Sequence, residues 1–107
     1  MHMNKMIHMI ETTWKGRRVV VEDKKGTSAA GVVKHIAWNI PADYYSSDDK
    51  MPLVQVELTP MNDEDAAAYG VNDKGLIVKC FDPMSIVFKL IDENGNYINA
   101  QDYDTTL

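Results

Sequence analysis

The sequence is poor in cysteine and in long apolar runs. Cys80 is the one cysteine in 107 residues, so the chain forms no internal disulfide. Its place in the apolar run 76–81 is typical of a small buried thiol. No run approaches the roughly 20 apolar residues that a membrane-spanning helix needs, and Asn4, Lys5 and His8 interrupt the apolar stretch that a secretory signal would need. These absences favour a cytoplasmic protein without a membrane partner.

The residue patterns of common catalytic and ligand sites are also absent. The three histidines are far apart, and none is spaced relative to Cys80 as zinc ligands are. His35, among apolar residues, is expected to be structural. No serine stands in a nucleophile-elbow context, and residues 24–28 have one glycine where a phosphate-binding loop needs more. We therefore predict no catalytic residue, no cofactor and no metal, and a protein that is not an enzyme.

What the chain does contain is typical of one globular domain. Hydrophobic residues make up 45% and charged residues 25% of the sequence, which are ordinary values for a folded chain. A chain of this length supports one core. We expect a single domain over residues 1–107, with its ordered part at about 6–98 and a flexible polar tail at 99–107.

Several segments have the pattern of β-strands. Residues 16–38 predict two strands joined by a polar turn, since Val19, Val20 and Val21 are β-branched, and Gly31 suggests a bulge or tight bend. Residues 53–58 alternate strictly between apolar and polar. Further strands are expected at 76–81, with Leu76, Val78 and Cys80 on one face, and at 86–90. Asn94-Gly95 favours a type I′ hairpin turn to a strand at 97–98.

Two segments suggest helix. Residues 63–69 follow a capping Asn62 or Thr59, begin with acids and end before Gly70, which predicts a short helix. Residues 6–14 fit either a strand or a short helix, and we favour the strand. The fold class is therefore mainly β, a small antiparallel barrel or roll of five to seven strands with one short helix.

The order of these segments over about residues 15–91 is a hairpin, a long loop, an alternating strand, a short helix and a strand pair split by FDPMS. This order resembles SH3-like small barrels, including the KOW type, whose glycine-containing strand-loop-strand is similar to residues 19–33. The resemblance implies an SH3-like (KOW-like) architecture. It transfers no site residue.

The best candidate for a binding surface is the loop 39–52, which contains two prolines and exceeds the usual length of a connection. Tyr44 and Tyr45 have the amphipathic side chains that are enriched in interface hot spots, and Asp48 and Asp49 would form a polar rim. The opposite interpretation is that the tyrosines fold back over the barrel. We favour a non-enzymatic module that binds another protein, such as a bacterial or phage accessory or regulatory factor, with self-association through an edge strand as a further alternative.

Charge suggests two other functions. The net charge is −5, but residues 1–38 hold seven basic and three acidic residues. The runner-up function is therefore KOW-like nucleic-acid binding through the basic hairpin, with Trp14 or Trp38 stacking on a base; the hairpin's basic residues are Arg17, Arg18, Lys24, Lys25 and Lys34. The third is an acidic mimic of DNA formed by Asp43, Asp48, Asp49, Asp63, Glu64 and Asp65.

Overall fold

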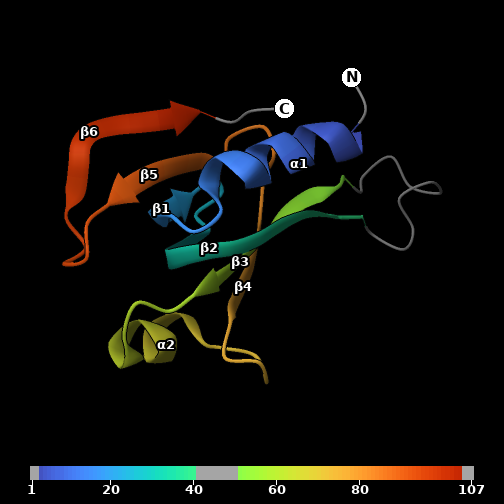
Figure 1. Ribbon diagram of the computed structural model, residues 1–107. Helices are drawn as coiled ribbons and strands as arrows, with labels where there is room; N and C mark the ends of the chain where they lie inside the picture. Colours follow the sequence, from blue (N-terminus) through green and yellow to red (C-terminus); the bar gives the residue numbers. More distant parts are fainter. Residues whose placement is uncertain (1–2, 41–50, 105–107) are drawn as a thin grey trace.

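The computed structural model of the chain describes residues 3–40 and 51–104 (Figure 1). Its six strands form one antiparallel sheet in the order β4-β3-β2-β1-β5-β6, curled into a half-barrel. The elements are α1 (Met3–Trp14), β1 (Arg18–Glu22), β2 (Ser28–Asn39), β3 (Leu53–Thr59), α2 (Asp63–Tyr69), β4 (Ile77–Phe81), β5 (Val87–Ile91) and β6 (Tyr97–Asp104). The mainly β class and the antiparallel strands are confirmed, with two helices in place of the expected one.

The strand favoured at residues 6–14 is wrong, because this segment belongs to helix α1. Ile7 and Trp14 are buried and Ile10 is partly buried, and this spacing places all three on one helical face. That face packs on the concave side of the sheet. The Trp14 ring stacks on Phe88 with centroids 5.0 Å apart and planes 12° from parallel. Helix α1 therefore closes the core of the half-barrel.

Strand β2 contains a β-bulge that keeps its apolar residues on the core side. Its register against β3 shifts between Val33 and His35, so Lys34 is an extra residue there. An extra residue reverses the alternation of faces. As a result Val33 and Ile36 are both buried, although three positions apart, and His35 is exposed.

Gly31 lies at a close approach of two backbones. A Cβ atom at this position would lie 2.6 Å from the carbonyl oxygen of Thr59, at the end of β3. Glycine is therefore required here by the neighbouring strand, and the bulge that follows in β2 is three residues further along.

The outer strands differ in detail from expectation. In β3 the predicted alternation is confirmed, with Val54, Val56 and Leu58 buried. In β4 the predicted facing is wrong: Ile77 and Phe81 are fully buried, whereas Val78 and Cys80 are only partly buried. Strand β6 continues past residue 98 to residue 104 and pairs with β5, where the sequence suggested a frayed tail.

Three turns share one hydrogen-bonding pattern, over residues 23–27, 72–76 and 92–96. In each, a side-chain oxygen of the first residue, Asp or Asn, accepts hydrogen bonds of 2.9–3.0 Å from the N–H groups two and four residues later. The fourth residue is a glycine with positive φ. Such a turn combines side-chain capping with the conformation that glycine adopts freely.

The type I′ turn predicted at Asn94-Gly95 is wrong by one residue. The Gly95 N–H donates to the Asp92 carbonyl at 3.0 Å, and the Asp92 N–H donates to the Asn96 carbonyl at 2.9 Å. Glu93 and Asn94 are therefore the central residues, and Gly95 follows them as a bulge residue. The predicted helix caps are confirmed, since the Asn62 side chain accepts from the Asp65 N–H and Gly70 ends α2.

Candidate binding surfaces

The predicted protein-binding residues Tyr44, Tyr45, Asp48 and Asp49 lie outside the described residues. The structure instead describes the two ends of that loop. Ile40 and Met51 flank the segment 41–50, which is not described, and they are 47% and 61% exposed. Two large apolar side chains are thus open to contact at the base of the segment.

An edge strand lies beside this base. Within the described sheet, β4 pairs only with β3, so its other side presents backbone N–H and C=O groups. The Asn39 amide, at the end of β2, donates to Gln55 Oε1 at 3.2 Å and to Cys80 Sγ of β4 at 3.4 Å. These bonds tie the base of the loop to the edge strand. The exposed apolar residues thus lie within two positions, along the chain, of residues that are bonded or paired within the sheet of β2, β3 and β4, and we call Ile40, Met51 and β4 together the loop-base surface.

The five basic residues of the hairpin do not form one cluster. Arg18 pairs with Val32 at one end of the hairpin, near Arg17 and Lys34, whereas Lys24 and Lys25 belong to the turn at the other end. Lys25 also lies close to Asp82: the pKa of that carboxyl is lowered mainly by the hydrogen bond from the Met84 N–H, and to a smaller extent by the hydrogen bond from Ser85 and the charge of Lys25. Arg17, Arg18 and Lys34 therefore lie at one end of the hairpin and the two turn lysines at the other.

Neither tryptophan provides an open stacking platform. Trp14 is 2% exposed and its ring lies against Phe88. Trp38 is partly buried and packs against the core cluster. The expectation that Trp14 could stack on a base is therefore wrong, and this removes one support for nucleic-acid binding.

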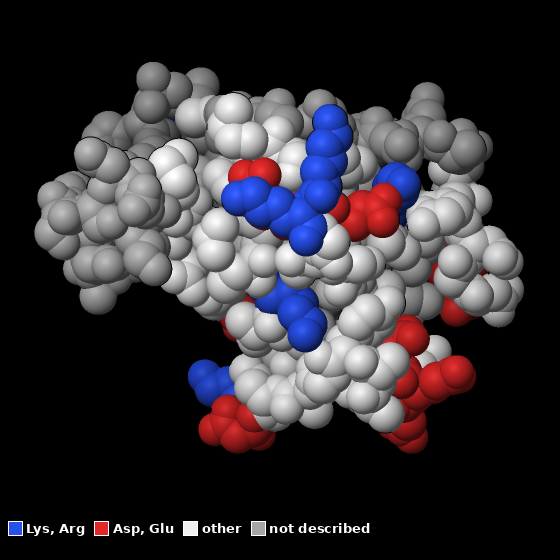
Figure 2. Space-filling view, turned by 180° about the vertical axis from the view of Figure 1, so that it is seen from behind, with Lys and Arg blue, Asp and Glu red and all other residues white. Residues whose placement is uncertain are grey.

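Acidic side chains gather at the end of the molecule that α2 occupies. Asp63, Glu64 and Asp65 form the first turn of this helix, where negative charge complements the helix dipole. In Figure 2 Lys and Arg side chains, interspersed with acids, lie across the middle of the face. The charge difference between the two halves of the sequence does not divide the molecule into a basic and an acidic half, because the basic N-terminal strands β1 and β2 lie between β3–β4 and β5–β6.

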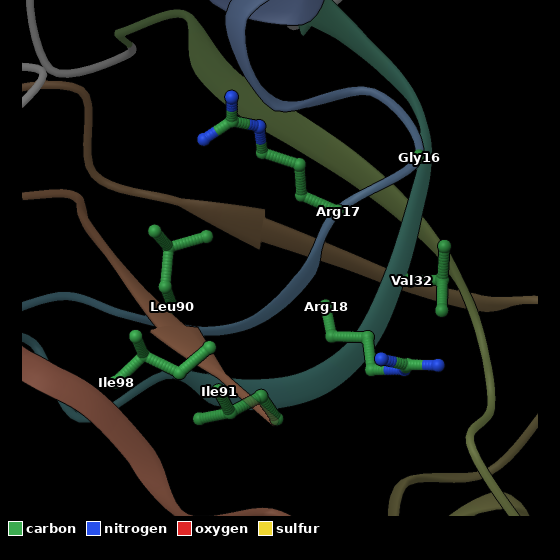
Figure 3. A pocket seen from close by; sticks show the side chains of 7 residues that line it. All are labelled: Gly16, Arg17, Arg18, Val32, Leu90, Ile91 and Ile98. Carbon is green, nitrogen blue, oxygen red and sulfur yellow. The ribbon is translucent and has the colours of Figure 1, made fainter. Parts of the chain in front are cut away.

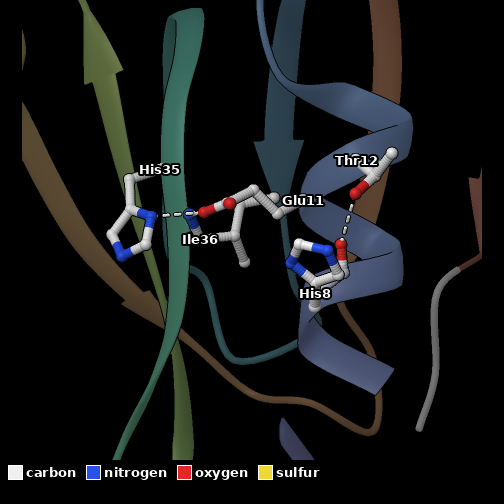
Figure 4. Close-up of polar contacts among 5 residues, drawn as sticks. All are labelled: His8, Glu11, Thr12, His35 and Ile36. Atoms are coloured by element: carbon white, nitrogen blue, oxygen red, sulfur yellow. Dashed lines mark hydrogen bonds and ion pairs between the residues drawn. The ribbon is translucent and has the colours of Figure 1, made fainter. Parts of the chain in front are cut away.

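A polar contact fastens α1 to the sheet. Glu11 accepts a hydrogen bond of 2.9 Å from the Ile36 N–H and pairs with Nδ1 of His35 (Figure 4). Ile36 lies beyond the end of β1's pairing with β2, so α1 supplies the acceptor that a neighbouring strand would otherwise provide. His35 thus has a structural partner, as the sequence suggested.

Burial raises the pKa of Glu11, but the hydrogen bond from Ile36 and the charge of His35 outweigh burial, so the pKa lies below its ordinary 4.5. A carboxyl whose folded pKa is lowered stabilises the fold above its ordinary pKa, and this contribution disappears as the pH falls through the lowered value. We therefore expect Glu11→Gln to lower the free energy of unfolding by about 1 kcal/mol at pH 6 and by less at pH 3, in urea titrations. The exposed Asp73→Asn is the matched control, and an equal loss at both pH values would contradict the role of the charge.

Two adjoining hollows lie beside the β1–β2 hairpin. The first, of about 530 Å³, is lined by Gly16, Arg17, Arg18, Val32, Leu90, Ile91 and Ile98 (Figure 3). The second, of about 540 Å³, lies between α2 and the turn after β5, over Val20 and Ala30. Ile91 lines both hollows. Sequence reasoning missed them because their residues come from β1, β2, α2, β5 and β6, with no shared local pattern.

The described part of the chain contains neither a cluster of metal ligands nor a membrane-spanning helix. Its His, Cys, Asp and Glu side chains form no group of three or more that could hold a metal ion. Neither α1 nor α2, the two helices described, is long and apolar enough to span a membrane. No family model, curated protein or solved structure matches the chain.

Proposed function

We propose that this chain is a non-enzymatic protein-binding module, an accessory or regulatory factor, whose partner docks on the loop 39–52 and the adjacent β4 edge. The observation that carries the proposal is the loop-base surface. Ile40 and Met51 are exposed there, and β4 leaves one side of its backbone unpaired in the described sheet. Exposed apolar side chains beside an open strand edge suit a partner that adds a strand and inserts side chains.

The charge pattern at this edge also favours a specific partner over indiscriminate pairing. Lys79 stands in the middle of β4, and a lysine on an edge strand discourages pairing with unrelated strands. A partner segment with an acidic residue opposite Lys79 would relieve the cost of covering that charge. We expect the partner to provide an extended segment with alternating apolar and polar or acidic residues.

Nucleic-acid binding by an SH3-like, KOW-like barrel is the alternative. It would use Arg17, Arg18 and Lys34, which lie at one end of the hairpin. The division of the basic residues and the burial of Trp14 make it the weaker proposal. The DNA-mimic alternative is weaker still, because Asp63, Glu64 and Asp65 have a local role at the start of α2.

Affinity capture separates these functions. Immobilised full-length protein is incubated with lysate of the organism that makes it, with and without nuclease and at low and high salt. A protein-binding module retains a discrete partner after nuclease and salt, because apolar contacts are not screened. Tyr44→Ala/Tyr45→Ala should reduce this capture, whereas Lys24→Glu/Lys25→Glu should not. Material that disappears with nuclease would overturn the proposal in favour of nucleic-acid binding.

A further inference from the structure

The two hollows beside the β1–β2 hairpin are consecutive along it. Arg18 pairs with Val32 beside the first hollow, and Val20 pairs with Ala30 beneath the second. Residues two apart on a strand lie on the same face, so Arg18, Val20, Ala30 and Val32 share the face opposite to the buried Val19. Arg17 and Leu90, the register partner of Val19, lie on the other side of β1, so the first hollow opens where β1 begins and reaches both sides of this strand. Because Ile91 lines both hollows, they form one groove with an apolar floor, which we call the hairpin groove.

The two ends of the hairpin groove carry opposite charge. Arg17 and Arg18 line the first hollow, and Glu64, Asp65 and Glu93 line the second. None of these five side chains forms an ion pair with another described residue. In Figure 3 the two arginine side chains extend away from each other, on different sides of the β1 backbone. They would therefore contact two separate anionic groups more readily than a single compact one.

We propose that the hairpin groove is a homodimer interface in which each copy's Arg17–Arg18 end faces the acidic end of the other copy. A two-fold axis exchanges the two ends of a surface. A groove that is basic at one end and acidic at the other is therefore complementary to itself when rotated by 180°. The exposed Arg17 and Arg18 side chains of each copy would then reach the acidic hollow of the other copy.

A second copy suits this groove better than a purely acidic or purely basic ligand. An acidic segment long enough to reach both hollows would meet Glu64 and Glu93, and a polyanion such as nucleic acid would meet the same repulsion. In a two-fold dimer the basic end of each groove faces the acidic end of the other, so all four charged ends face opposite charge. The inference is independent of the proposed function, because the loop-base surface and the hairpin groove share no residue.

The test uses charge exchange, with the mass of the full chain in solution measured by sedimentation over about 1–100 µM, a range that separates interfaces of standard size from weak contacts. We expect the wild type to approach twice its 12.1 kDa mass. Arg17→Glu/Arg18→Glu alone, and Glu64→Lys/Glu93→Lys alone, should each weaken self-association by at least about tenfold. An equimolar mixture of the two variants should restore the dimer, because one variant then has an acidic groove and the other a basic groove.

Lys24→Glu/Lys25→Glu is the matched control, since it makes the same change of charge at the other end of the hairpin and should leave the dimer intact. Thermal unfolding of each variant verifies that it folds, and restoration in the mixture also requires folded partners. A wild type that stays at 12.1 kDa would overturn the proposal. So would a dimer that neither variant weakens, or a mixture that fails to associate although both variants fold.

Discussion

Replacing Trp14 by alanine is expected to lower the free energy of unfolding by about 3–5 kcal/mol, because a large core side chain would leave a cavity. Trp14 is 2% exposed and stacks on Phe88, which is fully buried. It is also the last residue of α1, so its removal weakens the contact that holds this helix over the sheet. Because the free energy of unfolding of a domain is only about 5–15 kcal/mol, Trp14→Ala would remove a large fraction of the stability.

Urea unfolding followed by far-ultraviolet circular dichroism measures this loss. Met9→Ala is the matched control on the same helix, since Met9 is 53% exposed and alanine is a good helix former. Met9→Ala is expected to change the free energy of unfolding by no more than about 0.5 kcal/mol. A Trp14→Ala variant as stable as Met9→Ala would mean that α1 does not close the core.

Asp23→Ala is expected to have the second largest effect, a loss of about 2–3 kcal/mol, because one carboxylate satisfies three backbone N–H groups. Its Oδ1 accepts from Lys25 and Thr27 at 3.0 Å. Its Oδ2 accepts from the Asp82 N–H at 2.8 Å, which joins the β1–β2 turn to the turn between β4 and β5. Alanine removes all three hydrogen bonds, two of which are partly buried.

Asn variants separate the two roles of this carboxylate. In Asp23→Asn the amide oxygen can still accept from the N–H groups of the turn, as the Asn72 oxygen does in its own turn. The amide nitrogen takes the place of Oδ2, so the hydrogen bond from the Asp82 N–H is lost. The loss of stability in Asp23→Asn should therefore be about half that of Asp23→Ala, and Asn72→Ala should cost about 1 kcal/mol, like the loss of a helix cap. Equal unfolding free energies for Asp23→Ala and the wild type would contradict the role of this turn.

The sequence predicted those parts of the fold in which local pattern and burial agree. Strand β3 alternates strictly between apolar and polar residues, and α2 has both an Asn62 cap and a Gly70 stop. These signals are local, so they need no knowledge of the rest of the chain. The β1–β2 hairpin was likewise predictable from its valines and its polar turn.

Other elements could not be assigned because the local pattern was ambiguous. Residues 6–14 are apolar at both strand and helix spacing, and only packing of Ile7 and Trp14 against the sheet selects the helix. The run 76–81 is apolar except at Lys79, so alternation could not show that Ile77 and Phe81 face the core. Strand β6 is polar beyond Ile98, so no apolar pattern marks it as a strand; its place depends on pairing with β5.

The candidate surfaces were predictable only where they follow the chain. The loop 39–52 was identified from its prolines and tyrosines, and its ends at Ile40 and Met51 are exposed. The hairpin groove was not predictable, because Arg17, Ile91 and Glu64 meet only after the sheet has formed. The separation of Lys24 and Lys25 from Arg17 follows from the register of the hairpin, which sequence spacing alone leaves open.

The most direct test of the central claim is partner capture by Ile40→Ser/Met51→Ser compared with Met84→Ser. Met84 is 62% exposed, as open as Met51, but lies in the turn before β5. If the loop-base surface binds the partner, the double variant should lose most of the protein captured by the wild type after nuclease treatment, because apolar residues at the centre of an interface dominate its affinity. Met84→Ser should retain it. Undiminished capture by a folded Ile40→Ser/Met51→Ser protein would contradict the proposed function of this surface.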